Sequence, residues 1–198
     1  MKENIREKTK KPLDGLIGKA PLGKEGAEKK GGFFVRVSGL RPYILTYLVA
    51  IAIPLLVGIL SALLTKDFMI SYEELPKPPL APPAALFPIV WTVLYILMGI
   101  SSATAVISRD TDNMRSLRTS LEYYAMSLAL NFGWSIIFFR AEAYFGSLIW
   151  LLLLLFTVIK TVKNYKKVSK LSAYLQIPYV VWLIFAAYLN SFYALFAA

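Results

Sequence analysis

Aromatic and amide side chains recur at intervals of three or four residues in three apolar segments of this sequence. Residues at this spacing share one face of a helix. The rows are Trp91, Tyr95, Met98 and Ser102; Ser127, Asn131 and Trp134; and Tyr179, Trp182, Ala186, Asn190 and Tyr193. Indole faces stack on flat ligands, and amide and indole N–H groups bond carboxylates or carbonyls. The rows predict a pocket for a flat ligand, and ordinary packing between membrane helices is the alternative.

The composition excludes several classes of site. The chain has no cysteine and no histidine, so it lacks thiolate nucleophiles, the usual zinc and haem ligands and the common proton shuttle of neutral pH. The sequence shows no paired acid and base, no metal motif and no nucleotide motif. No charge lies at the centre of an apolar segment, where it could couple ion flow. We therefore expect a binding protein with no cofactor and no nucleic-acid partner.

Five apolar segments organise the chain. Of its 198 residues, 57 % are hydrophobic and the mean hydropathy is +0.57, which is more apolar than a soluble domain. Most of the segments approach the ~20 residues that cross a bilayer. They span about 43–64, 84–107, 123–139, 145–159 and 171–196. We predict an all-α membrane protein, with a bundle of five transmembrane helices over residues 42–198.

Residues 1–41 differ from the rest of the chain. They contain eleven Lys or Arg against five Asp or Glu and show no apolar period, which predicts a disordered, basic cytoplasmic tail that attracts anionic lipid or only aids solubility. The loops near 109–118 and 160–170 are also basic, whereas those at 65–83 and 140–142 are not. The positive-inside rule then places the N-terminus in the cytoplasm and the C-terminus outside, in the plasma membrane.

A row of small residues lies on another face of the third segment. Ala125, Ala129 and Gly133 are four residues apart, and such rows let two helices approach closely. Ser127 is rotated by roughly 200° from Ala125 on a helix of 3.6 residues per turn, so this row and the Asn131 row point in opposite directions. The small row predicts a homodimer interface, and packing within one bundle is the alternative.

Two sequence runs resemble a known family. They read SYEELPKPPLAPP at 71–83 and FPIVWTVLYILMG at 87–99, and they are similar to the corresponding motifs of the TspO/MBR family, the bacterial tryptophan-rich sensory proteins and mitochondrial translocator proteins. Further matches follow in order at Asn131 with Trp134, at Pro178-Tyr179 with Trp182, and at Asn190. The chain departs from the family pattern at three positions where the family has tryptophan: Ser71, Leu80 and Ala85.

The resemblance implies a five-helix bundle, often dimeric, with a ligand pocket closed by the first long loop. Its ligands would be porphyrins or other haem-related tetrapyrroles. The residues that it assigns to ligand binding are Trp91, Tyr95, Asn131, Trp134, Tyr179 and Trp182. Two alternatives stay open. One is an enzyme for light-dependent porphyrin degradation, in which Trp91 and Trp182 are the catalytic indoles. The other is a tetrapyrrole transporter.

Overall fold

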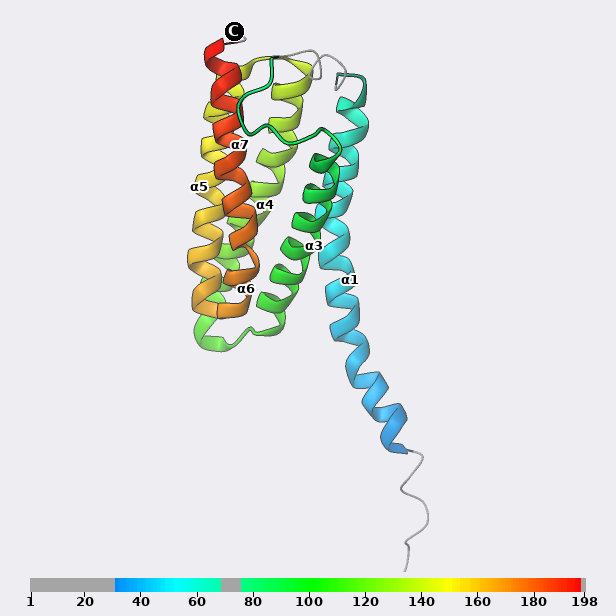
Figure 1. The fold of residues 1–198 in the computed structure, drawn as a ribbon. Helices are drawn as coiled ribbons and strands as arrows, with labels where there is room; N and C mark the ends of the chain where they lie inside the picture. Colours follow the sequence, from blue (N-terminus) through cyan, green and yellow to red (C-terminus); the bar gives the residue numbers. More distant parts are fainter. Residues whose placement is uncertain (1–30, 69–75, 197–198) are drawn as a thin grey trace, which may run out of the picture. The chain divides into compact units, whose positions relative to one another are not determined.

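The computed structural model describes residues 31–68 and 76–196, with side chains from residue 43 onward. The chain divides between Ser38 and Gly39 into two units. The second unit, Gly39–Ala198, carries the helical bundle (Figure 1). The predicted disordered tail lies mostly outside the described residues. Its last part, from Gly31, is already helical, because a helix extends readily once nucleated and Phe33 to Leu40 contain no proline to stop it.

The described parts contain helices and no strand, in agreement with the predicted all-α class. Five of the helices are long: α1 (Gly31–Thr65), α3 (Leu86–Ile107), α4 (Met114–Ser135), α5 (Tyr144–Val168) and α7 (Ile177–Phe196). The short elements are η1 (Lys66–Phe68), η2 (Thr111–Asn113), the π-helical turn η3 (Ile136–Arg140) and α6 (Lys170–Leu175).

Four stretches are long and apolar enough to cross a membrane: Tyr43–Phe68, Leu86–Ile107, Tyr144–Val168 and Lys170–Phe196. The predicted third span is different. Its helix, α4, is not among them, since its first turns carry Arg115, Arg118 and Glu122 and its centre carries the buried Asn131. A buried polar group is tolerated at membrane depth where protein covers it. The predicted segment at 123–139 begins inside α4 and ends in the π-helical turn η3.

Small residues set the spacing of neighbouring helices. A Cβ at Gly99 of α3 would collide with the backbone of α1 at Ile51, so these two helices touch at main-chain distance. The two helices are also joined where the hydroxyls of Tyr47 and Thr104 lie 3.1 Å apart. On the other side of the bundle, α4 and α5 meet where Trp150 Nε1 donates to the Leu130 carbonyl at 2.7 Å. The site residues are thus fixed by helices whose separations are set by glycine and by hydrogen bonds.

The predicted fifth span is broken near its start. Helix α6 ends at Leu175 and α7 begins at Ile177, followed by Pro178, which has no N–H to donate. At the break the Gln176 N–H donates to Ala173 instead of Ser172. The freed Ser172 carbonyl accepts from Ser101 Oγ of α3 at 2.7 Å. The side chain of α3 thus replaces a backbone donor that the break removes.

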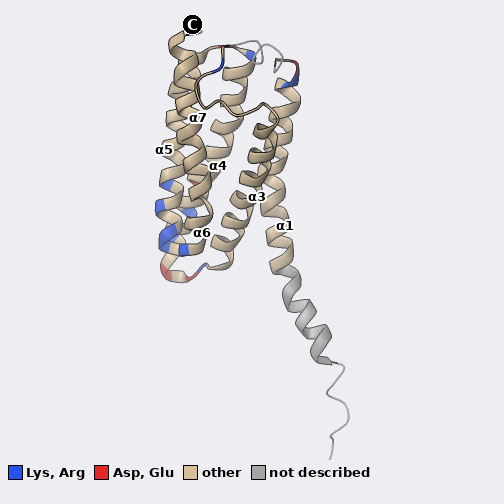
Figure 2. Cartoon of the chain, viewed as in Figure 1, with Lys and Arg blue, Asp and Glu red and all other residues tan. Residues whose placement is uncertain are grey.

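Charge is concentrated at one end of the bundle. Figure 2 shows basic residues gathered where α5 ends and α6 begins, at the same end as the loop between α3 and α4. They are Lys160, Lys163, Lys166, Lys167 and Lys170. The outer faces of the helices between the two ends carry exposed apolar side chains such as Leu56, Ile149 and Val181. This distribution suits a bundle surrounded by lipid.

Candidate functional site

Four aromatic rings form one cluster in the half of the bundle nearest the proline-rich segment. Trp91 is at its centre, with ring centroids 5.5 Å from Tyr95, 6.1 Å from Tyr179 and 6.4 Å from Trp182. The contacts with Tyr179 and Trp182 are edge to face, an arrangement that aromatic pairs prefer. Since Trp91 and Tyr95 are on α3 and the other two are on α7, the two helical rows face one another.

A buried amide holds this cluster in register. Asn131 of α4 is 1 % exposed, and its Nδ2 donates to Tyr179 Oη at 2.9 Å. Tyr95 Oη donates to Asn131 Oδ1 at 3.5 Å, a long and weak bond. The amide therefore joins α3, α4 and α7. Because it bonds both Tyr179 and Tyr95, Asn131 positions the aromatic rings of two helices.

A cavity of about 240 Å³ opens beside the cluster. Its walls come from α1, α3, the end of α4 and the π-helical turn. They consist of Leu55, Gly58, Ile59, Ser61, Ala62, Thr65, Phe87, Pro88, Trp91, Thr92, Tyr95, Trp134, Ser135 and Phe139. Five aromatic side chains and the buried residues Ser61 and Thr65 thus meet in a partly open, mostly apolar space. Such an arrangement can hold a flat apolar ring and offer it one hydrogen bond.

The polar groups around this cavity are not equally available. The hydroxyl of Ser61 is buried and makes no hydrogen bond, so it can donate to a ligand. Trp134 Nε1 is already bonded to Asn190 Oδ1 at 3.1 Å, and Asn190 is fixed in turn by the Tyr144 carbonyl. The Trp182 N–H is buried without a partner. Ser61 and Trp182 are therefore the donors with unused capacity here.

The structure places the predicted ligand residues in two layers. Trp91, Tyr95 and Trp134 line the cavity. Asn131 and Tyr179 lie behind them and act through hydrogen bonds to Tyr95 or to each other. Trp182 packs its ring against Trp91 and Phe87, with centroids 6.4 and 5.9 Å apart. The predicted residues therefore meet in space, but only the first three present a surface to the cavity.

Helix α1 supplies a wall that sequence reasoning did not identify. Gly58 lies directly against the ring of Tyr95, and a Cβ there would collide with it. Ser61 and Thr65, one and two turns further on, continue the same wall. The first segment is apolar on every side and carries no aromatic row, so nothing in its spacing singles out this face. The isolated Gly58 is the one signal, since a glycine within an apolar helix often marks a close approach.

Two cations flank the outer end of the cavity. Lys66 directly follows the wall residue Thr65, and Arg140 directly follows Phe139. The Arg140 guanidinium lies 5.8 Å from the centre of the Phe68 ring, a cation–π distance. Arg140 closes the π-helical turn, a rare element that often accompanies functional sites. Asp67 follows Lys66, and Glu142 lies two residues after Arg140, so charges of both signs lie at this end of the cavity, whereas its walls are uncharged.

The described part of the proline-rich segment is attached to α7. Tyr188 Oη donates to the Pro79 carbonyl at 2.7 Å. The next residue, Leu80, turns with φ at +67° and leaves its side chain 82 % exposed. Positive φ is unfavourable for leucine, so the backbone tie at Pro79 helps to hold this turn. Ser71, the first of the three positions where tryptophan is replaced, lies outside the described residues.

The row of small residues on α4 divides between two environments. Ala125 and Ala129 are exposed on the bundle surface. Gly133 faces α5, and a Cβ there would lie 2.9 Å from Trp150 Cζ2. The glycine is therefore needed to admit Trp150 within one chain. Ala125 and Ala129 remain the part of the row that a second copy could contact.

The sequence has clear relatives. Residues 50–195 match the TspO/MBR family. The tryptophan-rich protein TspO of Chlorobaculum tepidum is 35 % identical over 74 % of this chain and 92 % of its own length. Translocator protein 2 of the dog, Canis lupus familiaris, is 35 % identical over 69 % of this chain and 80 % of its own. A tryptophan-rich sensory protein of Cereibacter sphaeroides is 30 % identical over 74 % and 85 %.

These matches cover the helices that build the aromatic cluster, and the apolar helices of the bundle are those of a membrane protein. The order of the matched motifs, the five long helices and the positions of the tryptophans all agree with membership of this family. The chain is a member of the TspO/MBR family of membrane proteins.

Proposed function

We propose that this protein binds a flat, conjugated ligand of the tetrapyrrole class in the cavity beside Trp91. The observation that carries the proposal is the partly buried face of Trp91, which lines a cavity together with Tyr95 and Trp134. Stacking on such rings contributes about 0.5–1.5 kcal/mol per contact beyond the burial of apolar area. Ser61, with its unused hydroxyl in the same wall, would donate to a ring nitrogen or carbonyl of the ligand.

The size of the cavity limits how the ligand sits. At about 240 Å³ it is smaller than the roughly 300–1,000 Å³ of most small-molecule sites. A macrocycle would therefore insert one edge between Trp91 and α1 and leave the opposite edge at the mouth. Carboxylate substituents at that edge would then lie near Lys66 and Arg140. A neutral ring with anionic substituents on one side, as in many porphyrins, fits the apolar walls, and its anionic edge would pair with Lys66 or Arg140.

A titration with a porphyrin tests the proposal. Purified protein in detergent is mixed with a soluble dicarboxylic porphyrin, and binding is followed by the shift of its absorbance band. Trp91→Ala should weaken binding by roughly three- to tenfold, since a tenfold change corresponds to about 1.4 kcal/mol. Ser61→Ala should weaken it by a smaller factor. Unchanged porphyrin affinity in a variant that carries both Trp91→Ala and Trp134→Ala would show that the porphyrin does not bind in this cavity.

One observation favours a second function, light-driven degradation of the bound porphyrin. The indoles of Trp91 and Trp182 pack edge to face, with ring centroids 6.4 Å apart, and Trp91 lines the cavity. Indole rings are easily oxidised, so with dioxygen as the oxidant an excited porphyrin could react beside them. Loss of porphyrin absorbance under illumination, compared between wild type and Trp91→Phe, separates this function from simple binding.

The setting of this function is also part of the proposal. The basic end of the bundle would face the cytoplasm by the positive-inside rule, with the Trp91 site in the outer half of the plasma membrane. Ala125 and Ala129 would contact a second copy in a homodimer. The orientation rests on the basic end of the bundle, and the homodimer rests on the exposure of Ala125 and Ala129.

A further inference from the structure

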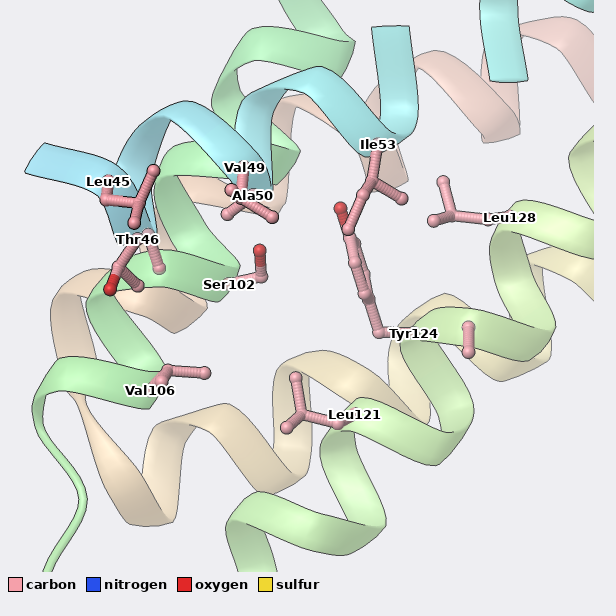
Figure 3. A pocket seen from close by; sticks show the side chains of 12 residues that line it. Leu45, Thr46, Val49, Ala50, Ile53, Ser102, Val106, Leu121, Tyr124 and Leu128 are labelled. Carbon is pink, nitrogen blue, oxygen red and sulfur yellow. The ribbon is translucent and has the colours of Figure 1, made fainter. Parts of the chain in front are cut away.

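A second and larger cavity lies in the other half of the bundle. Its volume is about 480 Å³, within the range of small-molecule sites, and it lies between α1, α3 and α4 (Figure 3). It shares no lining residue with the cavity beside Trp91. Every residue that lines it belongs to one of the three helices, and none belongs to a loop. A molecule would therefore reach it from the side, between α1 and α4, out of the lipid.

The walls of this cavity are almost entirely apolar. Leu45 and Ile53 contribute from α1, Val106 from α3, and Leu121 and Leu128 from α4. Among the described residues that line it, none is charged. A charged group buried here would lose its hydration without a partner, at a cost of several kcal/mol. Phosphate, carboxylate and ammonium headgroups are therefore excluded, and the occupant must be neutral.

One donor in this cavity is unused. Tyr124 is 7 % exposed, and its hydroxyl makes no well-formed hydrogen bond. The hydroxyl of Ser102, which donates to the Gly99 carbonyl of its own helix at 3.0 Å, is the group near enough to accept from Tyr124, in a contact that a ligand oxygen could replace. Figure 3 shows both hydroxyls pointing into the space beside α1. An unpaired buried donor is costly, and at membrane depth no bulk water can satisfy it.

The surroundings of Tyr124 narrow the class of ligand. Tyr124 lies two residues after Glu122, which is exposed and paired with Arg118, so it lies within one turn of the charged end of α4. The polar end of a ligand would therefore lie near this end of the cavity, and its apolar part would extend along α1. A carbonyl suits the Tyr124 O–H better than a hydroxyl, because a carbonyl only accepts and brings no further donor into an apolar space.

We propose that this cavity binds a neutral, lipid-soluble molecule that carries a carbonyl oxygen, a ketone or a quinone with an apolar chain, through a hydrogen bond from Tyr124. The chain lies along α1 between Leu45 and Ile53, and the carbonyl points to α4. This site is separate from the Trp91 site and does not depend on the function proposed there.

Photolabelling tests the proposal on the full chain in lipid nanodiscs. The probe is a long-chain methyl ketone with a diazirine in its tail, and the comparison probe is the same chain without the oxygen. Labelled peptides are identified by mass spectrometry, and affinity is measured by competition with unlabelled ketone. Wild type should label at α1 and α4 and prefer the ketone. Tyr124→Phe, which removes only the hydroxyl, should lower ketone affinity about three- to tenfold and leave the hydrocarbon unchanged.

Two further variants make the outcome decisive. Tyr123→Phe makes the same change at a neighbouring residue that does not line the cavity, and it should leave labelling unchanged. Ala50→Leu fills the cavity and should reduce labelling by both probes, while porphyrin affinity stays at the wild-type value. Equal affinity of wild type for ketone and hydrocarbon would overturn the proposal. Ala125 lines this cavity and also belongs to the small row proposed above as a dimer interface, so the two proposals compete for this residue. Cross-linking of Ala125 to a second copy in place of the probe would overturn the ligand site.

Discussion

The indole of Trp182 meets the indole of Trp91 edge to face, with ring centroids 6.4 Å apart and planes at 86°. Trp91 also lines the cavity, whereas Trp182 does not. The two tryptophans therefore have different relations to a ligand: one would touch it, and the other would support the first. Substitutions at the two positions should therefore distinguish stacking on the ligand from support of the Trp91 ring.

Phenylalanine at each position distinguishes these roles. Trp91→Phe keeps most of the stacking surface, so porphyrin affinity should stay within about threefold of wild type. Trp182→Phe should change affinity less than Trp91→Ala, because it acts only through Trp91. If the protein degrades porphyrin in light, Trp91→Phe should abolish that loss of absorbance. Equal breakdown by wild type and both phenylalanine variants would assign the indoles to binding alone.

The position of Arg140 directly after the wall residue Phe139 predicts that it pairs with anionic ligands. Arg140→Gln should weaken a dicarboxylic porphyrin several-fold, and the loss should shrink at high salt because the guanidinium is exposed. The dimethyl ester of the same porphyrin has no charge to pair, so its affinity should not change. Arg115→Gln, at the opposite end of the bundle, is the matched control. An equal loss for acid and ester would contradict the electrostatic role.

The contact between α1 and α3 predicts a sharp difference between two glycines. Gly99→Ala would push a methyl group into the α1 backbone at Ile51, which should destabilise the protein by about 1–3 kcal/mol. Gly146→Ala on α5 meets only Ala143 Cβ at 3.9 Å, so it should be neutral or gain up to about 1 kcal/mol from helix propensity. Thermal unfolding in detergent measures both. An unchanged unfolding temperature for Gly99→Ala would mean that α1 can move away from α3 without loss of stability.

The exposed part of the small row predicts an interface between copies. Ala129→Leu would hold two backbones apart and should shift the detergent-solubilised protein toward monomer, as measured by light scattering. Porphyrin binding should persist, because Ala129 does not line the cavity beside Trp91. If the oligomeric state is unchanged and binding is lost, this face belongs to the interior of one bundle.

Orientation can be read from single cysteines in this cysteine-free chain. Leu80→Cys, at an 82 % exposed position, should react with an impermeant maleimide added to intact cells. Lys167→Cys, in the last turn of α5, should react only after permeabilisation. The reverse pattern of labelling would mean that the basic end faces outward.

Much of the fold follows from the sequence, for reasons visible in particular residues. The apolar stretches predict the long helices, and helical spacing correctly groups Trp91 with Tyr95 and Tyr179 with Trp182. The start of α1 at Gly31 is not predictable in this way, because no polar cap marks it. The sequence predicts the third segment from residue 123, but its helix α4 starts at Met114, because the charged residues that precede the apolar run hide its first turns.

The candidate site is less predictable than the fold. Spacing shows which residues share a face, but it does not show which hydrogen bonds they make. Spacing predicts that Asn131 faces the pocket, but it does not show that its amide bonds Tyr179 and Tyr95. Ser61 and Gly58 were missed because the first segment is apolar all around, and only packing against α3 selects one of its faces. The residues that bound a cavity are determined by neighbours distant in sequence.

The break between α6 and α7 has a consequence for how this chain can change during evolution. The carbonyl freed at Ser172 is satisfied by the hydroxyl of Ser101, on a different helix, so the position of the break is specified twice in the sequence. A relative that lost Pro178 and straightened this helix would let the Gln176 N–H return to the Ser172 carbonyl and would no longer need Ser101. A relative that lost Ser101 alone would leave a buried carbonyl unpaired. Residues 101 and 178 should therefore covary across homologous sequences.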